Sequence, residues 1–70
     1  MNVVKIREEP IELYKLLKLS NMVASGGEGK VVVAEGLVLL NGAVETRKRK
    51  KIVVGDVVEF NGEKMQVIHA

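Results

Sequence analysis

Two different hydrophobic patterns follow one another along the first part of the chain and predict a strand and then a helix. Valine and isoleucine dominate residues 2–6, which is typical of a short strand. Three leucines then recur at helical spacing, at Leu13, Leu16 and Leu17. We expect this helix to begin at Pro10, because a first turn does not need the N–H group that proline lacks, and to end near Leu19. The helix dipole favours an acid such as Glu12 in that turn.

The valine-rich segment at residues 30–40 is ambiguous when it is considered alone. Its β-branched residues favour a strand. The preceding residues, Ser25-Gly26-Gly27-Glu28, form a capping box, in which Ser25 accepts a hydrogen bond from the N–H of residue 28 and Glu28 accepts one from the N–H of residue 25. Gly36 stands where a left-handed residue closes a helix. We therefore expect a second helix over residues 26–35.

Turn residues divide the rest of the chain into short strands. Asn41-Gly42 and Asn61-Gly62 are strong signals for tight hairpins, and Gly55-Asp56 marks a further turn. The predicted strands cover residues 37–40, 43–46, 52–54, 57–60 and 63–68. The expected fold class is α+β: after a short first strand, two N-terminal helices pack on a small antiparallel sheet, in a single domain over residues 1–70.

The composition indicates a small domain that is held together by packing alone. The chain has 70 residues, of which 47% are hydrophobic, and it has no cysteine. Its core must therefore be thin and cannot be braced by disulfides or thiolate-bound metal. No hydrophobic run approaches the roughly 20 residues that span a membrane, and the first residues lack the apolar core of a signal peptide. We expect a cytoplasmic protein with no membrane partner.

Positive charge is concentrated in one run of five residues. We call residues 47–51 the basic run; its members are Arg47, Lys48, Arg49, Lys50 and Lys51. The net charge is only +2, because the other six basic and nine acidic residues leave the rest of the chain negative. Such a local excess favours an anionic partner, whereas the plain alternative is a solvated turn that keeps the protein soluble.

The order and spacing of the motifs resemble a known RNA-binding family. The matching residues are Ser25, Gly36, Val38, Asn41-Gly42, Gly55-Asp56 and Val58. This arrangement, over residues 11–60, is similar to the RNA-binding domain first seen in ribosomal small-subunit protein S-four, which is also called the αL motif. Residues 11–18, 25–30 and 44–50 are most similar to the small stand-alone members, the YbcJ-like proteins.

The resemblance implies an RNA site that combines the basic run with lysines of the two helices. If the helices pack as the family's do, Lys15 and Lys18 of the first helix and Lys30 of the second extend the patch; otherwise they are ordinary surface lysines. The basic run must then form a loop or bulge, because neighbours in a straight strand face opposite sides. Family members often begin the first helix with an arginine and an aspartate used around the RNA. Ile11 and Glu12 stand near those places here, so those contacts are not carried over.

The glycines that open the second helix have two alternative roles. Free N–H groups at Gly26 and Gly27 are able to attract a phosphate, and close backbone approach is the other explanation for glycine there. We assign Ser25 and Glu28 a structural role as caps, since Glu28 would compete with a phosphate.

The aromatic residues limit how an RNA would be recognised. The chain has only one tyrosine and one phenylalanine, Tyr14 and Phe60, and we expect Phe60 in the core. A platform for stacking the bases of a single strand is therefore not expected. We predict a structured RNA, with ribosomal and transfer RNA as the candidates, that is recognised through its phosphate backbone.

Two other classes of function have less support in the sequence. A protein-interaction adaptor would dock an acidic partner through the same basic run. An enzyme is not expected, because the only histidine is His69 near the C-terminus and the chain has no cysteine nucleophile. A chain of this length is also expected to lack a large concave pocket. We therefore expect no catalytic residues, no cofactor and no bound metal.

Overall fold

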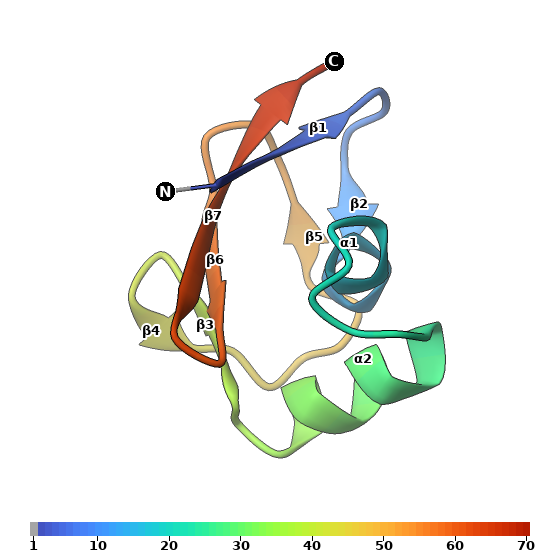
Figure 1. Cartoon of the computed structure of the whole chain (residues 1–70), viewed down its shortest axis with the longest axis vertical. Helices are drawn as coiled ribbons and strands as arrows, with labels where there is room; N and C mark the ends of the chain where they lie inside the picture. Colours follow the sequence, from blue (N-terminus) through green and yellow to red (C-terminus); the bar gives the residue numbers. More distant parts are fainter. Residues whose placement is uncertain (1) are drawn as a thin grey trace.

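The main sheet is built from segments that lie far apart in the sequence. In the computed structural model, which describes residues 2–70, its five strands have the order β1-β7-β6-β3-β4. Their bounds are β1 Asn2–Ile6, β3 Val38–Leu40, β4 Ala43–Val44, β6 Val57–Phe60 and β7 Glu63–His69. Strand β1 runs parallel to β7, and the other three pairs are antiparallel. Figure 1 shows this sheet on one side of the molecule and the helices on the other.

The α+β class is confirmed, but the expectation of a purely antiparallel sheet is wrong. The sheet is mixed, because β1 pairs in parallel with β7 from Asn2↔Met65 to Ile6↔His69. The N-terminal placement of the helices is not confirmed either, because the expected strand β1 and an unexpected second strand, β2 (Ile11–Glu12), precede them. The valine and isoleucine content predicted β1 itself correctly, yet it carries no information on the direction in which a strand pairs.

A second, two-stranded sheet leads into the first helix. Strand β2 pairs antiparallel with β5 (Lys51–Ile52), and Ile11 lies opposite Ile52. Helix α1 (Leu13–Leu19) follows directly, so the expected start at Pro10 is wrong. Residues 11 and 12 extend to pair with β5, and Glu12, with extended backbone, becomes the N-cap rather than a residue of the first turn. The predicted end at Leu19 is confirmed.

The second helix is specified by its caps. Helix α2 (Gly26–Ala34) begins after Ser25, whose Oγ accepts from the Glu28 backbone N–H at 3.1 Å. Glu28 Oε1 in turn accepts from the N–H of Ala24 at 2.7 Å, one residue earlier than expected. Gly36 has φ +76°, the predicted left-handed closure. Local capping therefore overrides the strand preference of the valines, as predicted.

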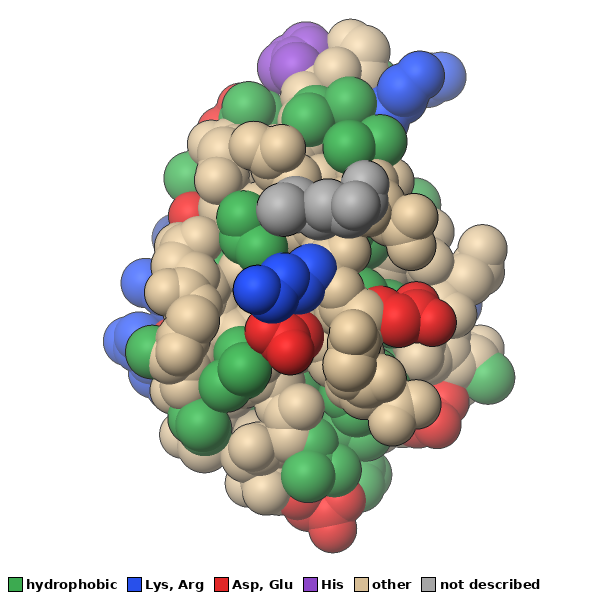
Figure 2. Space-filling model, turned by 60° about the vertical axis from the view of Figure 1, so that its left-hand side comes forward, with side chains coloured by type: hydrophobic (Ala, Val, Ile, Leu, Met, Phe, Trp, Pro, Cys, Tyr) green, Lys and Arg blue, Asp and Glu red, His purple; other side chains and the backbone are tan. Residues whose placement is uncertain are grey.

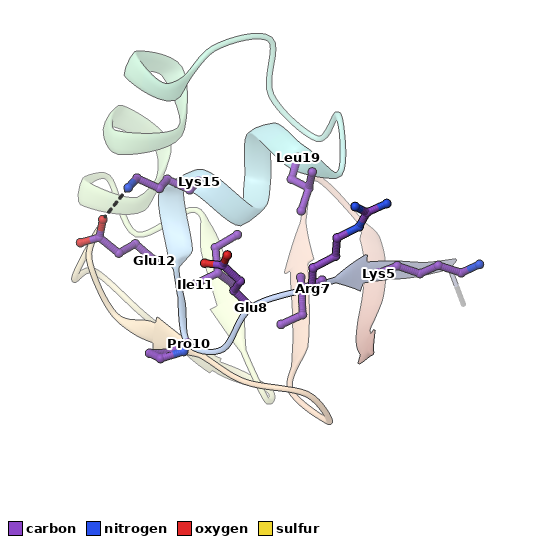
Figure 3. Close-up of a pocket in the computed structure, with 9 residues that line it drawn as sticks. Lys5, Arg7, Glu8, Pro10, Ile11, Glu12, Lys15 and Leu19 are labelled. Atoms are coloured by element: carbon purple, nitrogen blue, oxygen red, sulfur yellow. Dashed lines mark ion pairs between the residues drawn. The ribbon is translucent and has the colours of Figure 1, made fainter. Parts of the chain in front are cut away.

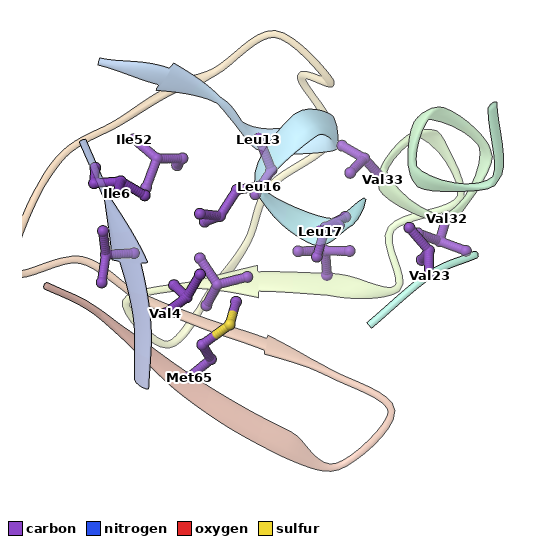
Figure 4. Close-up of a cluster of buried hydrophobic side chains, with 13 residues drawn as sticks. Val4, Ile6, Leu13, Leu16, Leu17, Val23, Val32, Val33, Ile52 and Met65 are labelled. Atoms are coloured by element: carbon purple, nitrogen blue, oxygen red, sulfur yellow. The ribbon is translucent and has the colours of Figure 1, made fainter. Parts of the chain in front are cut away.

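The core lies between α1 and the main sheet, with α2 closing one end (Figure 4). The predicted leucine stripe is confirmed, because Leu13, Leu16 and Leu17 are fully buried. Their buried neighbours come from every layer of the fold: Val4, Ile6, Val23, Val32, Val33, Val38, Ile52, Val58, Met65 and Val67. Phe60 is partly buried and packs against this cluster.

Both predicted Asn-Gly hairpin turns are confirmed. Asn41 and Gly42 have φ +51° and +86°, and Asn61 and Gly62 have φ +54° and +81°. The first turn is also tied to the predicted turn at residues 55 and 56, because Asn41 Nδ2 donates to Asp56 Oδ1 at 3.1 Å. These contacts fix the hairpin of β3 and β4 against the start of β6.

The side of the molecule that carries the main sheet is chemically mixed. On the face shown in Figure 2, charges of both signs are scattered among hydrophobic and polar side chains, and basic side chains gather only at the left-hand edge. Within residues 2–70, neither helix is long and apolar enough to cross a membrane.

Candidate functional site

The backbone of the basic run is anchored to the start of helix α1. The N–H of Leu13 donates to the carbonyl oxygen of Lys50 at 2.9 Å, and the N–H of Tyr14 donates to that of Lys48 at 3.0 Å. The first N–H groups of a helix have no partner within the helix, so the run satisfies two of them. The run thus lies against the helices although it is far from them in sequence.

The predicted loop conformation of the basic run is present. Its first four residues lie outside the strands and contain a turn that is closed by the Lys50 N–H and the Arg47 carbonyl oxygen at 3.0 Å. Only Lys51 belongs to a strand, β5. Side chains of four members line one shallow hollow: Arg47, Arg49, Lys50 and Lys51. Lys48 does not line this hollow.

Arg47 is held by a carboxylate that the sequence analysis did not consider. Its Nε and Nη2 donate to the two carboxylate oxygens of Glu45 at 3.0 and 3.1 Å, and its backbone N–H donates to Oε2 at 3.0 Å. These bonds lower the pKa of Glu45 to about 2 and raise the pKa of Arg47. Much of the charge of Arg47 is therefore already compensated within the protein.

This ion pair predicts a pH-dependent contribution to stability. A carboxyl whose pKa is lowered from 4.5 to about 2 stabilises the folded state fully above the higher value and loses that effect as the pH falls through the lower one. We expect Glu45→Gln to cost up to about 1 kcal/mol above pH 5, the usual range for exposed pairs. Urea unfolding of both proteins at several pH values should show this difference shrinking towards pH 2. A difference that stays constant over this range would contradict the assignment.

A second carboxylate is shared by two basic residues. Glu12 lies 3.2 Å from Lys15 Nζ (Figure 3) and 3.5 Å from Arg49 Nη1. Lys15, and then Arg49, lower the pKa of the Glu12 carboxyl. Both pairs are exposed to solvent, so each is weak and open to competition from another anion.

The other five lysines of the candidate site have no carboxylate partner within residues 2–70. They are Lys18, Lys30, Lys48, Lys50 and Lys51. The structure brings Lys15 and Lys30 close to the basic run around the ring of Tyr14. Lys18 is exposed in the last turn of α1, and no described contact joins it to the run.

Tyr14 is the member of this surface that sequence reasoning missed. Its ring centroid lies 4.9 Å from Lys30 Nζ, 5.6 Å from Arg49 Cζ and 5.8 Å from Lys15 Nζ. The helices approach closely here, since a methyl group on Gly29 would lie 2.9 Å from the carbonyl oxygen of Tyr14. Spacing in the sequence could not reveal this meeting, because the three cations come from α1, α2 and the basic run.

A second open hollow lies beside helix α1 and shares Glu12 and Lys15 with the surface around Tyr14. Figure 3 shows it between the end of β1, the segment before β2 and α1, with charged side chains around hydrophobic ones. The residues that line it are Lys5, Ile6, Arg7, Glu8, Pro10, Ile11, Glu12, Lys15 and Leu19. Its cavity volume of about 540 Å³ contradicts the expectation that the chain is too short for a concave pocket. The irregular path between β1 and β2 creates this space.

The site thus consists of a basic loop that is anchored against two closely packed helices, beside a small mixed sheet. This arrangement can be compared with those of known protein families. The family model described as "S4 domain" matches residues 4–68, so the chain belongs to the S4 domain family. This finding confirms the resemblance to the domain of ribosomal protein S-four that the motifs indicated.

Particular relatives agree with this assignment. The chain is 52% identical over 58 residues, 83% of either chain, to an Escherichia coli (strain K12) protein named "Putative RNA-binding protein YbcJ". It is 41% identical over 61 residues, 87% of this chain and 86% of the other, to the Bacillus subtilis "Probable ribosome maturation protein RlbA".

Two solved structures are similar to the fold. The solution structure of E. coli YbcJ, described as revealing an αL motif involved in RNA-binding, has a TM-score of 0.74 and 46% identity, covering 97% of this chain and 87% of that one. The crystal structure of 30S ribosomal protein S4e from Thermoplasma acidophilum has a TM-score of 0.61 and 27% identity, covering 83% of this chain and 31% of that one.

Proposed function

We propose that this protein binds structured RNA by contacting its phosphate backbone through the basic run, and that Lys30 and Lys15 extend the contact surface. Membership of the S4 domain family supports the proposal. The description of the similar E. coli structure, an αL motif involved in RNA-binding, supports it further. The proposed partner is therefore a nucleic acid, and the proposed role is recognition without catalysis.

The observation that carries the proposal is the anchoring of the basic run. Two backbone hydrogen bonds, from Leu13 and Tyr14, hold the run against the start of α1. Lys48, Lys50 and Lys51 have no ion pair within the described residues. A cation held in place and free of a carboxylate binds a phosphate without first losing a protein contact, and it releases the counterions of the RNA.

The contributions of the two arginines differ from those of the lysines. Arg47 donates two side-chain hydrogen bonds to Glu45, so a phosphate must compete for it or use its remaining N–H groups. Within residues 2–70, Arg49 donates a single long side-chain hydrogen bond, at 3.5 Å, to Glu12. We therefore place Arg49 and the lysines in contact with RNA and assign Arg47 mainly to holding the loop. No described contact joins Lys18 to the basic run, so we place Lys18 at the periphery of the RNA contact surface.

The scarcity of aromatic side chains favours a structured RNA. Phe60 packs against the core, and the Tyr14 ring is already flanked by three cations. Recognition of unpaired bases generally uses several exposed aromatic rings. This surface is therefore suited to recognise a folded RNA by its shape and by the geometry of its phosphate backbone.

The salt dependence of binding tests the proposal. We expect a labelled RNA stem-loop to bind with a log–log slope of about −3.5 to −4.5 against salt concentration, which corresponds to four to five neutralised phosphates at about −0.9 each. Fluorescence anisotropy over a range of KCl concentrations measures this slope. A slope near zero, or no binding at low salt, would refute the proposal.

The adaptor alternative gives a different result in a pull-down experiment. If RNA is the partner, ribonuclease treatment should remove the RNA and everything held through it. A stoichiometric protein that remains bound after digestion, together with no binding of the stem-loop, would instead support docking of an acidic protein. The comparisons with known proteins do not favour this alternative.

A further inference from the structure

The ring of Tyr14 is surrounded by cations from three different elements. Lys15 comes from α1, Lys30 from α2 and Arg49 from the basic run, and all three lie within 4.9–5.8 Å of the ring centroid. We call these four residues the tyrosine subsite. Residues so far apart in the sequence meet here because α2 packs closely on α1 at Gly29 and the basic run is bonded to the start of α1.

The charges of the tyrosine subsite are only partly balanced. Glu12 is its one carboxylate, and it contacts Lys15 and Arg49 but not Lys30. Lys30 is half-buried and lies nearest to the ring, at 4.9 Å. Three cations that share one carboxylate repel one another, so the subsite is more stable when a further anion joins it.

The tyrosine ring provides a way to hold these cations in place. The face of an aromatic ring attracts ammonium and guanidinium groups that lie within about 6 Å of its centroid. All three cations lie within this distance of the Tyr14 ring. One edge of the ring is packed near Gly26, where an added methyl group would lie 3.7 Å from the ring. The ring thus lies beside α2, and three long side chains converge around it.

We infer that the tyrosine subsite holds one phosphate group of the RNA, with Lys30 and Arg49 as its charge contacts and Tyr14 as the positioning residue. The inference rests on the proposed function and deepens it, because it assigns a particular phosphate position beyond the basic run. Tyr14 acts through its ring face. A phenylalanine ring, which keeps the same attraction for cations but lacks the hydroxyl, therefore satisfies the same role.

The test compares Tyr14→Leu, Tyr14→Phe and Lys30→Gln, with Lys64→Gln on strand β7 as the charge-matched control for Lys30. RNA stem-loop affinity is measured over a range of KCl concentrations, and thermal unfolding shows that each variant is folded. We expect Lys30→Gln to lower affinity by about fivefold to tenfold and to reduce the salt slope by about one phosphate. Tyr14→Leu should show a similar loss, whereas Tyr14→Phe and Lys64→Gln should stay within about twofold of wild type.

Several outcomes would overturn the inference while leaving the proposed RNA binding through the basic run intact. If wild type binds RNA but Tyr14→Leu and Lys30→Gln bind equally well, the subsite holds no phosphate. If Tyr14→Leu loses affinity with an unchanged salt slope, the ring stacks on a base instead. If Tyr14→Phe loses as much as Tyr14→Leu, the hydroxyl rather than the ring face is responsible. Should Tyr14→Leu be unfolded, the Lys30→Gln and Tyr14→Phe results decide alone. Failure of wild type to bind RNA is a distinct result and overturns the proposed function itself.

Discussion

Replacing Lys48, Lys50 and Lys51 together by glutamine should lower the affinity for an RNA stem-loop by about a hundredfold at about 0.15 M salt. Each lost phosphate contact removes about 0.9 from the log–log salt slope, so three contacts account for a change of this order. These lysines have no ion pair within residues 2–70, so the substitutions leave no carboxylate unpaired there. Anisotropy titrations across salt concentrations measure both the affinity and the slope.

The matched control removes the same charge from a different part of the surface. Lys5, Arg7 and Lys64 lie on or next to strands β1 and β7, and a triple glutamine variant at these positions has the same net charge as the first variant. It should bind within a few-fold of wild type, because distant exposed charges are largely screened. Equal losses in the two triple variants would show that binding depends on net charge alone and would contradict a localised site.

A methyl group added at Gly29 should destabilise the fold by about 1–3 kcal/mol, although alanine is normally favoured over glycine within a helix. The added carbon would lie 2.9 Å from the carbonyl oxygen of Tyr14, a backbone atom that is unable to move without shifting helix α1. The cost of this overlap exceeds the gain of about 1 kcal/mol in helix propensity. Urea unfolding of Gly29→Ala measures the change in the free energy of unfolding.

A second glycine of the same helix provides the control. At Gly27 an added methyl group meets only Ser25 Oγ at 3.8 Å, an ordinary contact, and the residue is exposed. Gly27→Ala should therefore be neutral or stabilise the fold by up to about 1 kcal/mol. If both substitutions raise the stability, the two helices are not in the close contact described for Tyr14 and Gly29.

The features that the sequence predicts well depend on neighbouring residues. Ser25 and Glu28 cap helix α2 through contacts that span a few positions, and Asn41-Gly42 adopts its turn because of its own backbone preferences. The leucine stripe of α1 likewise follows from spacing within one helix. Each of these elements is decided locally, so its signal survives in a sequence that is examined without its tertiary context.

The features that the sequence did not predict depend on distant partners. Nothing local in β1 specifies that it pairs in parallel with β7, and nothing local in Ile11 shows that it will face Ile52 in a second sheet. The interpretation of Pro10 as a helix start failed for the same reason. The helix begins at Leu13, three residues later than predicted. Its first N–H groups donate to the basic run, which is distant in the sequence.

The sequence predicted the positive charge of the candidate site but not the way in which its side chains are arranged. The five cations of the basic run are visible in the sequence, as is the need for a loop to gather them. The pairing of Arg47 with Glu45 was visible in principle, since the two residues are only two positions apart, but a choice between several nearby acids requires coordinates. The meeting of Lys30 and Arg49 around Tyr14 has no local signal, because it depends on how the helices pack.

The parallel partnership of β1 with β7 also bears on how the chain folds during its own synthesis. The first strand is synthesised before the other elements described, and its partner, Glu63–His69, is synthesised after all of them. Until then Val4 and Ile6, which are buried in the finished protein, have no sheet to join. Contacts that span so much of a chain form late and slowly. Completion of the sheet must therefore wait until β7 and every element between the two strands have been translated.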